Sequence, residues 1–176
     1  AFVMLLMMFI MWPRASVSAK RINEVLATKS SIIDPLEPVY PTSDKGTIEF
    51  KDVSFRYPDA AADILEHISF KANKGDTIAF IGSTGSGKST LVNLVTRLYD
   101  VTSGQILIDD VDIRDLSQKT LREMIGFVPQ KGLLFSGTVN SNIRFGNPSL
   151  SEEGVKKACE VACADEFVSK MEKGYE

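Results

Sequence analysis

Apolar and polar side chains alternate between Ile48 and Tyr57, which predicts a half-buried β-strand. The alternation slips by one position near Lys51 and Asp52, and such a slip is typical of a β-bulge. Further apolar runs predict strands over residues 64–72, 76–81, 105–109 and 125–129. Helical spacing of apolar residues is found over 14–29, 88–99, 120–124 and beyond Pro148, where Ser149 or Ser151 would cap the helix. This mixture of elements indicates α/β or α+β architecture.

The first twelve residues, AFVMLLMMFIMW, contain no polar side chain. A helix of this length reaches about 18 Å, whereas a bilayer core is about 30 Å thick. No basic region precedes the run, which argues against a signal peptide. Basic residues follow it, beginning at Arg14, and they mark the cytoplasmic side of a membrane helix. We interpret residues 1–12 as the C-terminal end of a transmembrane helix, with a helix buried in a soluble core as the alternative.

Residues 13–46 read as a helical extension and a linker. We expect Pro13 to kink the start of the extension, where its missing N–H matters least. Pro35, Pro38 and Pro41 follow, and proline favours extended backbone in the residue before it. A soluble domain is therefore predicted over residues 47–176.

The overall composition is that of an ordinary globular protein. The chain has 176 residues, of which 44% are apolar and 24% charged, and its net charge is −3. These values exclude a wholly disordered chain, a collagen-like chain and a disulfide scaffold. Because there is no basic excess, we expect no nucleic-acid partner.

A phosphate-binding loop is the strongest motif in the sequence. It matches G-x-x-x-x-G-K-[ST] at every fixed position, is preceded by an apolar run and is followed by helical spacing. Its residues are Gly82, Ser83, Thr84, Gly85, Ser86, Gly87, Lys88 and Ser89, followed by Thr90. Glycines let successive N–H groups face an anion, and a helix N-terminus adds a positive dipole. A chance turn rich in Gly and Ser is the bland alternative.

Two side chains of the loop suit a nucleoside triphosphate. The ammonium of Lys88 supplies a mobile charge for the β- and γ-phosphates. The hydroxyl of Ser89 can join the octahedral oxygen shell of Mg²⁺. The loop thus predicts nucleotide binding without deciding which reaction follows, because many proteins share it.

Several segments around the loop add specificity. Phe55-Arg56-Tyr57-Pro58 precedes it, and Val128-Pro129-Gln130 and Leu134-Phe135-Ser136-Gly137-Thr138 follow it. From about Thr47 to its C-terminus the chain resembles the nucleotide-binding domain of ABC transporters, specifically of exporters that fuse this domain to a transmembrane domain. The resemblance implies a P-loop NTPase fold, ATP as ligand and Mg²⁺ as cofactor.

The resemblance also assigns roles to single residues. Tyr57 corresponds to the aromatic that stacks on adenine, although a tyrosine at this position could simply belong to a strand core. Gln130 corresponds to a glutamine whose amide oxygen reaches Mg²⁺ or the attacking water, although alone it would read as a surface loop residue. Lys88 and Gln130 are therefore the expected contributors to catalysis, with Ser89 and Gln130 at the metal.

Other parts of the family's catalytic machinery are not found in this sequence. There is no aspartate–glutamate pair after a later apolar strand, no L-S-G-G-Q segment and no histidine after the loop. Asp109 ends an apolar run, but a turn role is expected for it because it follows the loop too closely. His67 reads as a surface or edge-strand residue. Cys159 and Cys163 read as small core residues of a helix.

We therefore expect the ATP-binding portion of a multi-pass membrane exporter, with its nucleotide-binding domain in the cytoplasm. Expected partners are a second nucleotide-binding domain, in a homo- or heterodimer, the transmembrane domains and membrane lipid. We expect the chain to be a piece of a longer protein and to be inactive by itself. The alternatives are a degenerate ATP-binding half of an asymmetric pair and a non-transport P-loop NTPase or kinase.

Overall fold

The computed structural model describes residues 2–42 and 45–176, and its contacts divide the chain into two compact units, Ala1–Phe127 and Val128–Glu176. Ala1 of the predicted membrane segment and positions 43–44 of the predicted linker lie outside the described residues.

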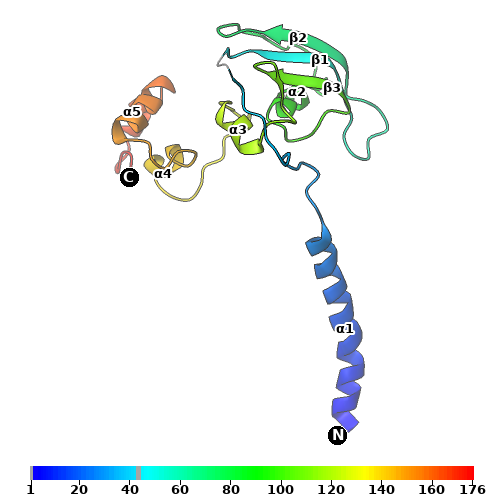
Figure 1. Cartoon of the computed structure of the whole chain (residues 1–176). Coiled ribbons are helices and arrows are strands. Elements are labelled where there is room, and N and C mark those ends of the chain that lie inside the picture. The colour runs from blue at the N-terminus through cyan, green and yellow to red at the C-terminus, as the bar shows by residue number, and fades with distance from the viewer. Residues whose placement is uncertain (1, 43–44) are drawn as a thin grey trace. The chain divides into compact units, whose positions relative to one another are not determined.

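One long helix, α1 (Phe2–Ala27), opens the first unit (Figure 1). It runs through Pro13 without ending, so the predicted membrane segment and the first part of the predicted helical extension lie in one helix. The missing N–H of Pro13 removes one backbone hydrogen bond, and the good helix formers on both sides carry the helix past it. With 26 residues, α1 is about 39 Å long. By length and composition it can cross a membrane.

A four-stranded antiparallel sheet follows, in the order β2-β1-β3-β4. Its strands are β1 (Ile48–Phe55), β2 (Leu65–Ala72), β3 (Ser103–Ile108) and β4 (Val111–Asp112). The pairing of β1 with β2 shifts register between Phe50 and Val53, which confirms the predicted bulge. Asp52 in the bulge has a φ of 51°, and β3 passes so close that a Cβ on Gly104 would lie 2.3 Å from the Asp52 carbonyl oxygen. Only glycine fits there.

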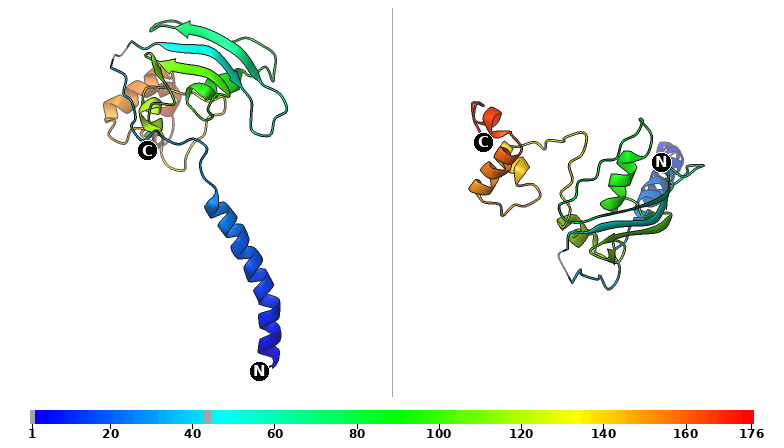
Figure 2. Two further views of the ribbon diagram at one scale, coloured as in Figure 1. Left: turned by 45° about the vertical axis from the view of Figure 1, so that its right-hand side comes forward. Right: turned by 90° about the horizontal axis from the view of Figure 1, so that it is seen from above.

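The core of the first unit lies between this sheet and two helices, α2 (Lys88–Val95) and α3 (Gln118–Glu123) (Figure 2). The alternating apolar residues of β1 meet the apolar faces of the helices, and the buried cluster includes Phe50, Phe55, Leu91, Leu94 and Leu121. The helix predicted over 88–99 ends earlier, because Arg97 adopts the left-handed region with a φ of 51°.

Two predicted strands, over 76–81 and 125–129, do not form in the described structure. A strand requires a neighbour that accepts and donates its backbone hydrogen bonds. Within residues 2–42 and 45–176 neither segment has such a partner. Several of their apolar side chains stay exposed as a result, with Ile81 at 95% and Val128 at 92%.

The linker is attached to the first unit by backbone and side-chain hydrogen bonds. The N–H of Val39 donates to the carbonyl of Asp115 at 2.9 Å. The N–H of Gln118 donates to Asp34 at 2.9 Å, and this bond is the main reason why the pKa of that carboxyl is lowered. Residues 28–42 thus form neither helix nor strand, and these hydrogen bonds hold them against the first unit.

The second unit contains α4 (Val139–Ile143), α5 (Glu152–Val161) and α6 (Asp165–Val168). The side chain of Ser151 accepts a hydrogen bond from the N–H of Gly154, which confirms one of the two predicted caps of α5. Cys159 is buried, as expected of a core residue. Cys163 is exposed, so its prediction as a core residue is wrong: α5 ends at Val161, and Cys163 has a φ of 53°.

Candidate phosphate and nucleotide site

The phosphate loop turns directly into α2, as the sequence predicts. Gly85 and Gly87 have φ values of 86° and 85°, a region that side chains with a Cβ rarely adopt. Gly87 is also tightly packed, since a Cβ there would lie 2.8 Å from the Cδ2 methyl of Leu65 on β2. The glycines therefore give the loop its curvature and bring it against the sheet.

Lys88 at the start of α2 folds over the loop. Its Nζ donates to the carbonyl oxygens of Gly82 at 2.9 Å and Ser83 at 2.6 Å, and to the hydroxyl of Ser86 at 3.3 Å. The first N–H groups of α2 lie at the same end, where the helix dipole is positive. The ammonium and these N–H groups together form a cationic site that suits the oxygens of a phosphate chain.

Ser89 and Thr90 occupy the first turn of α2 but have different surroundings. Ser89 is exposed, so its hydroxyl is accessible to a metal ion beside the loop, and a hard oxygen donor suits Mg²⁺. Thr90 is only 5% exposed, and its hydroxyl shares a 2.9 Å hydrogen bond with the hydroxyl of Tyr57. Of the predicted site residues, Ser89 thus fits a metal ligand, whereas Thr90 connects the loop to the aromatic.

Tyr57 lies just beyond β1 and is half-buried against the core. Its ring meets Phe55 and Tyr99 edge to face, with centroids 4.9 and 5.1 Å away. Tyr57 therefore belongs partly to the core, as the alternative interpretation held, and its stacking on adenine stays a prediction. Sequence reasoning missed Tyr99, because helical spacing placed it inside a helix that ends before it.

Gln130 belongs to the second unit and is exposed there. The other four predicted side-chain contributors, Tyr57, Lys88, Ser89 and Thr90, all belong to the first unit. A role of Gln130 at Mg²⁺ or at the attacking water therefore stays a prediction.

Asp109 and His67 are of residue types that often act in catalysis, but both have structural roles here. Asp109 is buried in the turn between β3 and β4 with a φ of 50°, and its carboxylate accepts the N–H of Thr47 at 2.8 Å. His67 is exposed on the edge strand β2, as predicted, with its Nδ1 2.8 Å from a carboxylate oxygen of Asp52. That hydrogen bond and the charge of Asp52 raise the pKa of His67.

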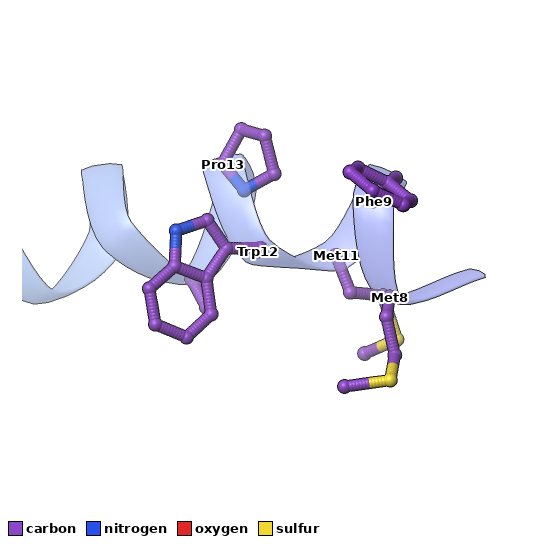
Figure 3. Close-up of a pocket in the computed structure, with 6 residues that line it drawn as sticks. Met8, Phe9, Met11, Trp12 and Pro13 are labelled. Carbon is purple, nitrogen blue, oxygen red and sulfur yellow. The ribbon is translucent and has the colours of Figure 1, made fainter. Parts of the chain in front are cut away.

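An apolar hollow of about 680 Å³ lies along α1, far along the chain from the phosphate loop (Figure 3). It is lined by Met8, Phe9, Met11, Trp12, Pro13 and Ala15. None of these side chains carries a group that can ligate a metal strongly or transfer a proton. The hollow is therefore a feature of the apolar surface of α1, and the phosphate loop is the stronger candidate for chemistry.

Comparison with known protein families gives a match to the family model described as "ABC transporter" over residues 65–174. This range includes the complete phosphate loop and more than half of the chain. An uncharacterized ABC transporter ATP-binding protein of Mycobacterium tuberculosis, Rv1273c, is 45% identical over 172 residues. That alignment covers 96% of this chain and 30% of the relative.

Two proteins of Bacillus subtilis are similarly related. YfiB, an uncharacterized ABC transporter ATP-binding protein, is 42% identical over 175 residues, which cover 99% of this chain and 30% of YfiB. YgaD, named provisionally as a multidrug export ATP-binding/permease protein, is 40% identical over 159 residues, which cover 90% of this chain and 27% of YgaD. The chain thus spans less than a third of the length of these relatives.

A solved structure agrees with the sequence relatives. A bacterial Atm1-family ABC exporter with ATP bound matches this fold with a TM-score of 0.83 and 31% identity. The match covers 93% of this chain and 28% of the exporter chain. The phosphate loop, the family model and this structural match agree, and the chain belongs to the ABC transporter family.

Proposed function

We propose that this chain is the ATP-binding portion of an ABC exporter, which couples ATP binding and hydrolysis to the transport of a substrate across a membrane. The observation that carries the proposal is the phosphate loop, in which Lys88 Nζ lies 2.9 and 2.6 Å from two loop carbonyl oxygens at the start of α2. The match to an ATP-bound exporter structure supports the choice of nucleotide and of family.

The proposed roles follow from the chemistry of each group. The loop N–H groups from Gly82 to Thr90 hold the phosphates, and the Lys88 ammonium moves from the loop carbonyls to the phosphate oxygens. The Ser89 hydroxyl and the Gln130 amide oxygen bind Mg²⁺, which neutralises charge on the phosphates. The ring of Tyr57 stacks on adenine.

The partners and location are proposed on the same basis. The relative YgaD carries both ATP-binding and permease in its name, and α1 is apolar enough to cross a membrane. We assign residues 1–12 to the end of a transmembrane helix in contact with lipid, residues 13–46 to a helical extension and a proline-rich linker, and residues 47–176 to part of a cytoplasmic nucleotide-binding domain. A second such domain would face it, supplying the L-S-G-G-Q segment, and closure of the pair would drive the membrane helices between two states.

The binding proposal is tested with the 176-residue chain in detergent and Mg·ATP. Charged hydrogen bonds contribute about 1.5–3 kcal/mol each, so Lys88→Ala is expected to raise the Kd about 10- to 150-fold. Lys119→Ala is the matched control, because Lys119 is exposed on α3 and its nearest carboxylate partner is 3.9 Å away. Equal affinity of the wild type and Lys88→Ala would refute the proposed site.

Hydrolysis needs groups that this sequence does not contain, namely the acidic pair and the L-S-G-G-Q segment. We therefore expect the chain by itself to bind ATP with negligible turnover. Mg²⁺-dependent release of phosphate that disappears in Lys88→Ala would contradict this part of the proposal and would require a carboxylate of this chain at the site.

A further inference from the structure

The half-buried Tyr57 ring is in edge-to-face contact with two aromatic neighbours. Phe55, which is 2% exposed, meets it at an interplanar angle of 80°, and Tyr99 meets it at 88°. Perpendicular contacts of this kind place the positive edge of one ring against the negative face of another. They restrict rotation of the Tyr57 ring about its second side-chain torsion, which is otherwise broad.

The hydroxyl of Tyr57 is fixed as well. It shares a 2.9 Å hydrogen bond with the hydroxyl of Thr90, a residue 33 positions later in the first turn of α2. Thr90 is 5% exposed, so this bond is partly sheltered from water. The side chain expected at the base is thereby tied to the helix that carries the phosphate loop.

We propose that Thr90 and Tyr99 are positioning residues for base recognition, which hold the Tyr57 ring in the orientation that receives adenine. The proposal rests on the proposed function, because it takes ATP as the ligand. Its physical basis is preorganisation: a ring that is already oriented loses less conformational freedom when the base binds. The geometry assigns Thr90 to the base half of the site, although the sequence motif places it beside the phosphates.

The competing role for Thr90 is a direct contact between its hydroxyl and a phosphate oxygen. The two roles differ in what they predict for a ligand without a base. Inorganic tripolyphosphate carries the same phosphate chain as ATP, so a contact between the Thr90 hydroxyl and a phosphate would strengthen the binding of both ligands alike. A positioning role through Tyr57 would strengthen the binding of ATP only, because only ATP carries a base.

The experiment measures Kd for Mg·ATP and for Mg·tripolyphosphate in the 176-residue chain. Thr90→Val and Tyr99→Leu are each expected to raise the Kd for Mg·ATP about three- to tenfold, which is the range for one net hydrogen bond or one aromatic pair. The Kd for Mg·tripolyphosphate is expected to change less than about twofold. Thr90→Ser and Tyr99→Phe keep the hydroxyl and the ring respectively, and are expected to restore ATP binding. Thr77→Val and Tyr40→Leu, at exposed positions outside the cluster, serve as matched controls.

A cycle with Tyr57→Phe isolates the hydrogen bond. This variant keeps the ring and removes only the hydroxyl, so it should raise the Kd for Mg·ATP as much as Thr90→Val does. The double variant should be no weaker than either single one, because both remove the same bond. Additive losses would overturn the link between the two residues.

Three further results would overturn the proposal: equal losses of ATP and tripolyphosphate in Thr90→Val, unchanged ATP affinity in Thr90→Val and Tyr99→Leu, or no rescue by the conservative variants. An unfolding midpoint measured by circular dichroism for each variant shows whether a uniform loss comes from the fold. Failure of the proposed function has a different signature, namely a wild-type chain whose affinity for ATP is unaffected by Lys88→Ala.

Discussion

Replacement of Arg97 by methionine is expected to destabilise the first unit and to release the linker. Arg97 is 4% exposed and follows α2, the helix of the phosphate loop. Its Nε donates to Asp100 at 2.8 Å, and its Nη2 donates to the carbonyl of Ile33 in the linker at 3.3 Å. Nη1 lies 3.3–3.5 Å from three carbonyl oxygens of the loop before α3, those of residues 113, 114 and 116.

These contacts set the expected decrease in the free energy of unfolding of Arg97→Met. The charged bond to Asp100 contributes about 1.5–3 kcal/mol, and the longer bonds to carbonyls contribute less. Methionine also leaves the carbonyls of Ile113 and Leu116 without their donor, at about 1–3 kcal/mol for a buried unpaired group. Asp100 is one-third exposed and can be hydrated, which limits the total. We expect about 3–5 kcal/mol, the usual loss for breaking a buried ion pair.

Urea denaturation followed by far-ultraviolet circular dichroism measures this loss. Trp12 fluorescence is unsuitable, because that side chain is 77% exposed on α1. Arg122→Met is the matched control, since Arg122 is exposed on α3 and donates to the side chain of Gln118; we expect a change within about 0.5 kcal/mol. Trypsin cleavage after Lys29 should accelerate in Arg97→Met only. A loss below about 1 kcal/mol, or unchanged cleavage, would refute the reasoning.

Three further predictions concern the loop, the sheet edge and α5. Gly87→Ala should lower the free energy of unfolding by urea by about 1–3 kcal/mol, because of the positive φ of Gly87 and the clash of a Cβ there with a leucine methyl of β2. Gly75 also has a positive φ but open space around it, so Gly75→Ala measures the backbone strain alone. Equal losses in the two variants would exclude a contribution from the clash. His67 should titrate by NMR above its ordinary pKa of 6.5, so its pairing with Asp52 stabilises the fold below pH 6.5 and is lost as pH rises through the raised value. An ordinary pKa, or one unchanged in Asp52→Asn, would contradict this. Ser151→Ala should cost about 1 kcal/mol and accelerate amide exchange in the first turn of α5, whereas unchanged exchange would argue against the cap.

Local features of the fold were predictable where neighbouring residues decide them. The bulge near Asp52 follows from a slip in the alternation, and the cap of α5 follows from a serine before two glutamates. The curvature of the phosphate loop follows from glycine spacing. Each of these depends on residues a few positions apart, so no knowledge of the tertiary structure is needed.

Predictions failed where a distant partner decides the outcome. The run around Ile81 is as apolar as a buried strand, yet strand formation requires backbone partners that the described residues do not provide. The helix of the phosphate loop ends before Arg97, because that side chain turns to carbonyls of the linker and of the loop before α3. Cys163 has helical spacing from Cys159, but the helix has already ended.

The sequence by itself determined the family, the phosphate loop and the residues expected at the nucleotide, because these rest on residue types at fixed local spacing. Only the tertiary structure decided that Thr90 bonds to Tyr57 and that Arg97 bonds to Ile33. These pairs are 33 and 64 positions apart. Contacts between residues so far apart in the sequence depend on which faces of the sheet and the helices pack together. Many residues have a side chain that could form each of these bonds, and only the folded core decides which of them comes close enough.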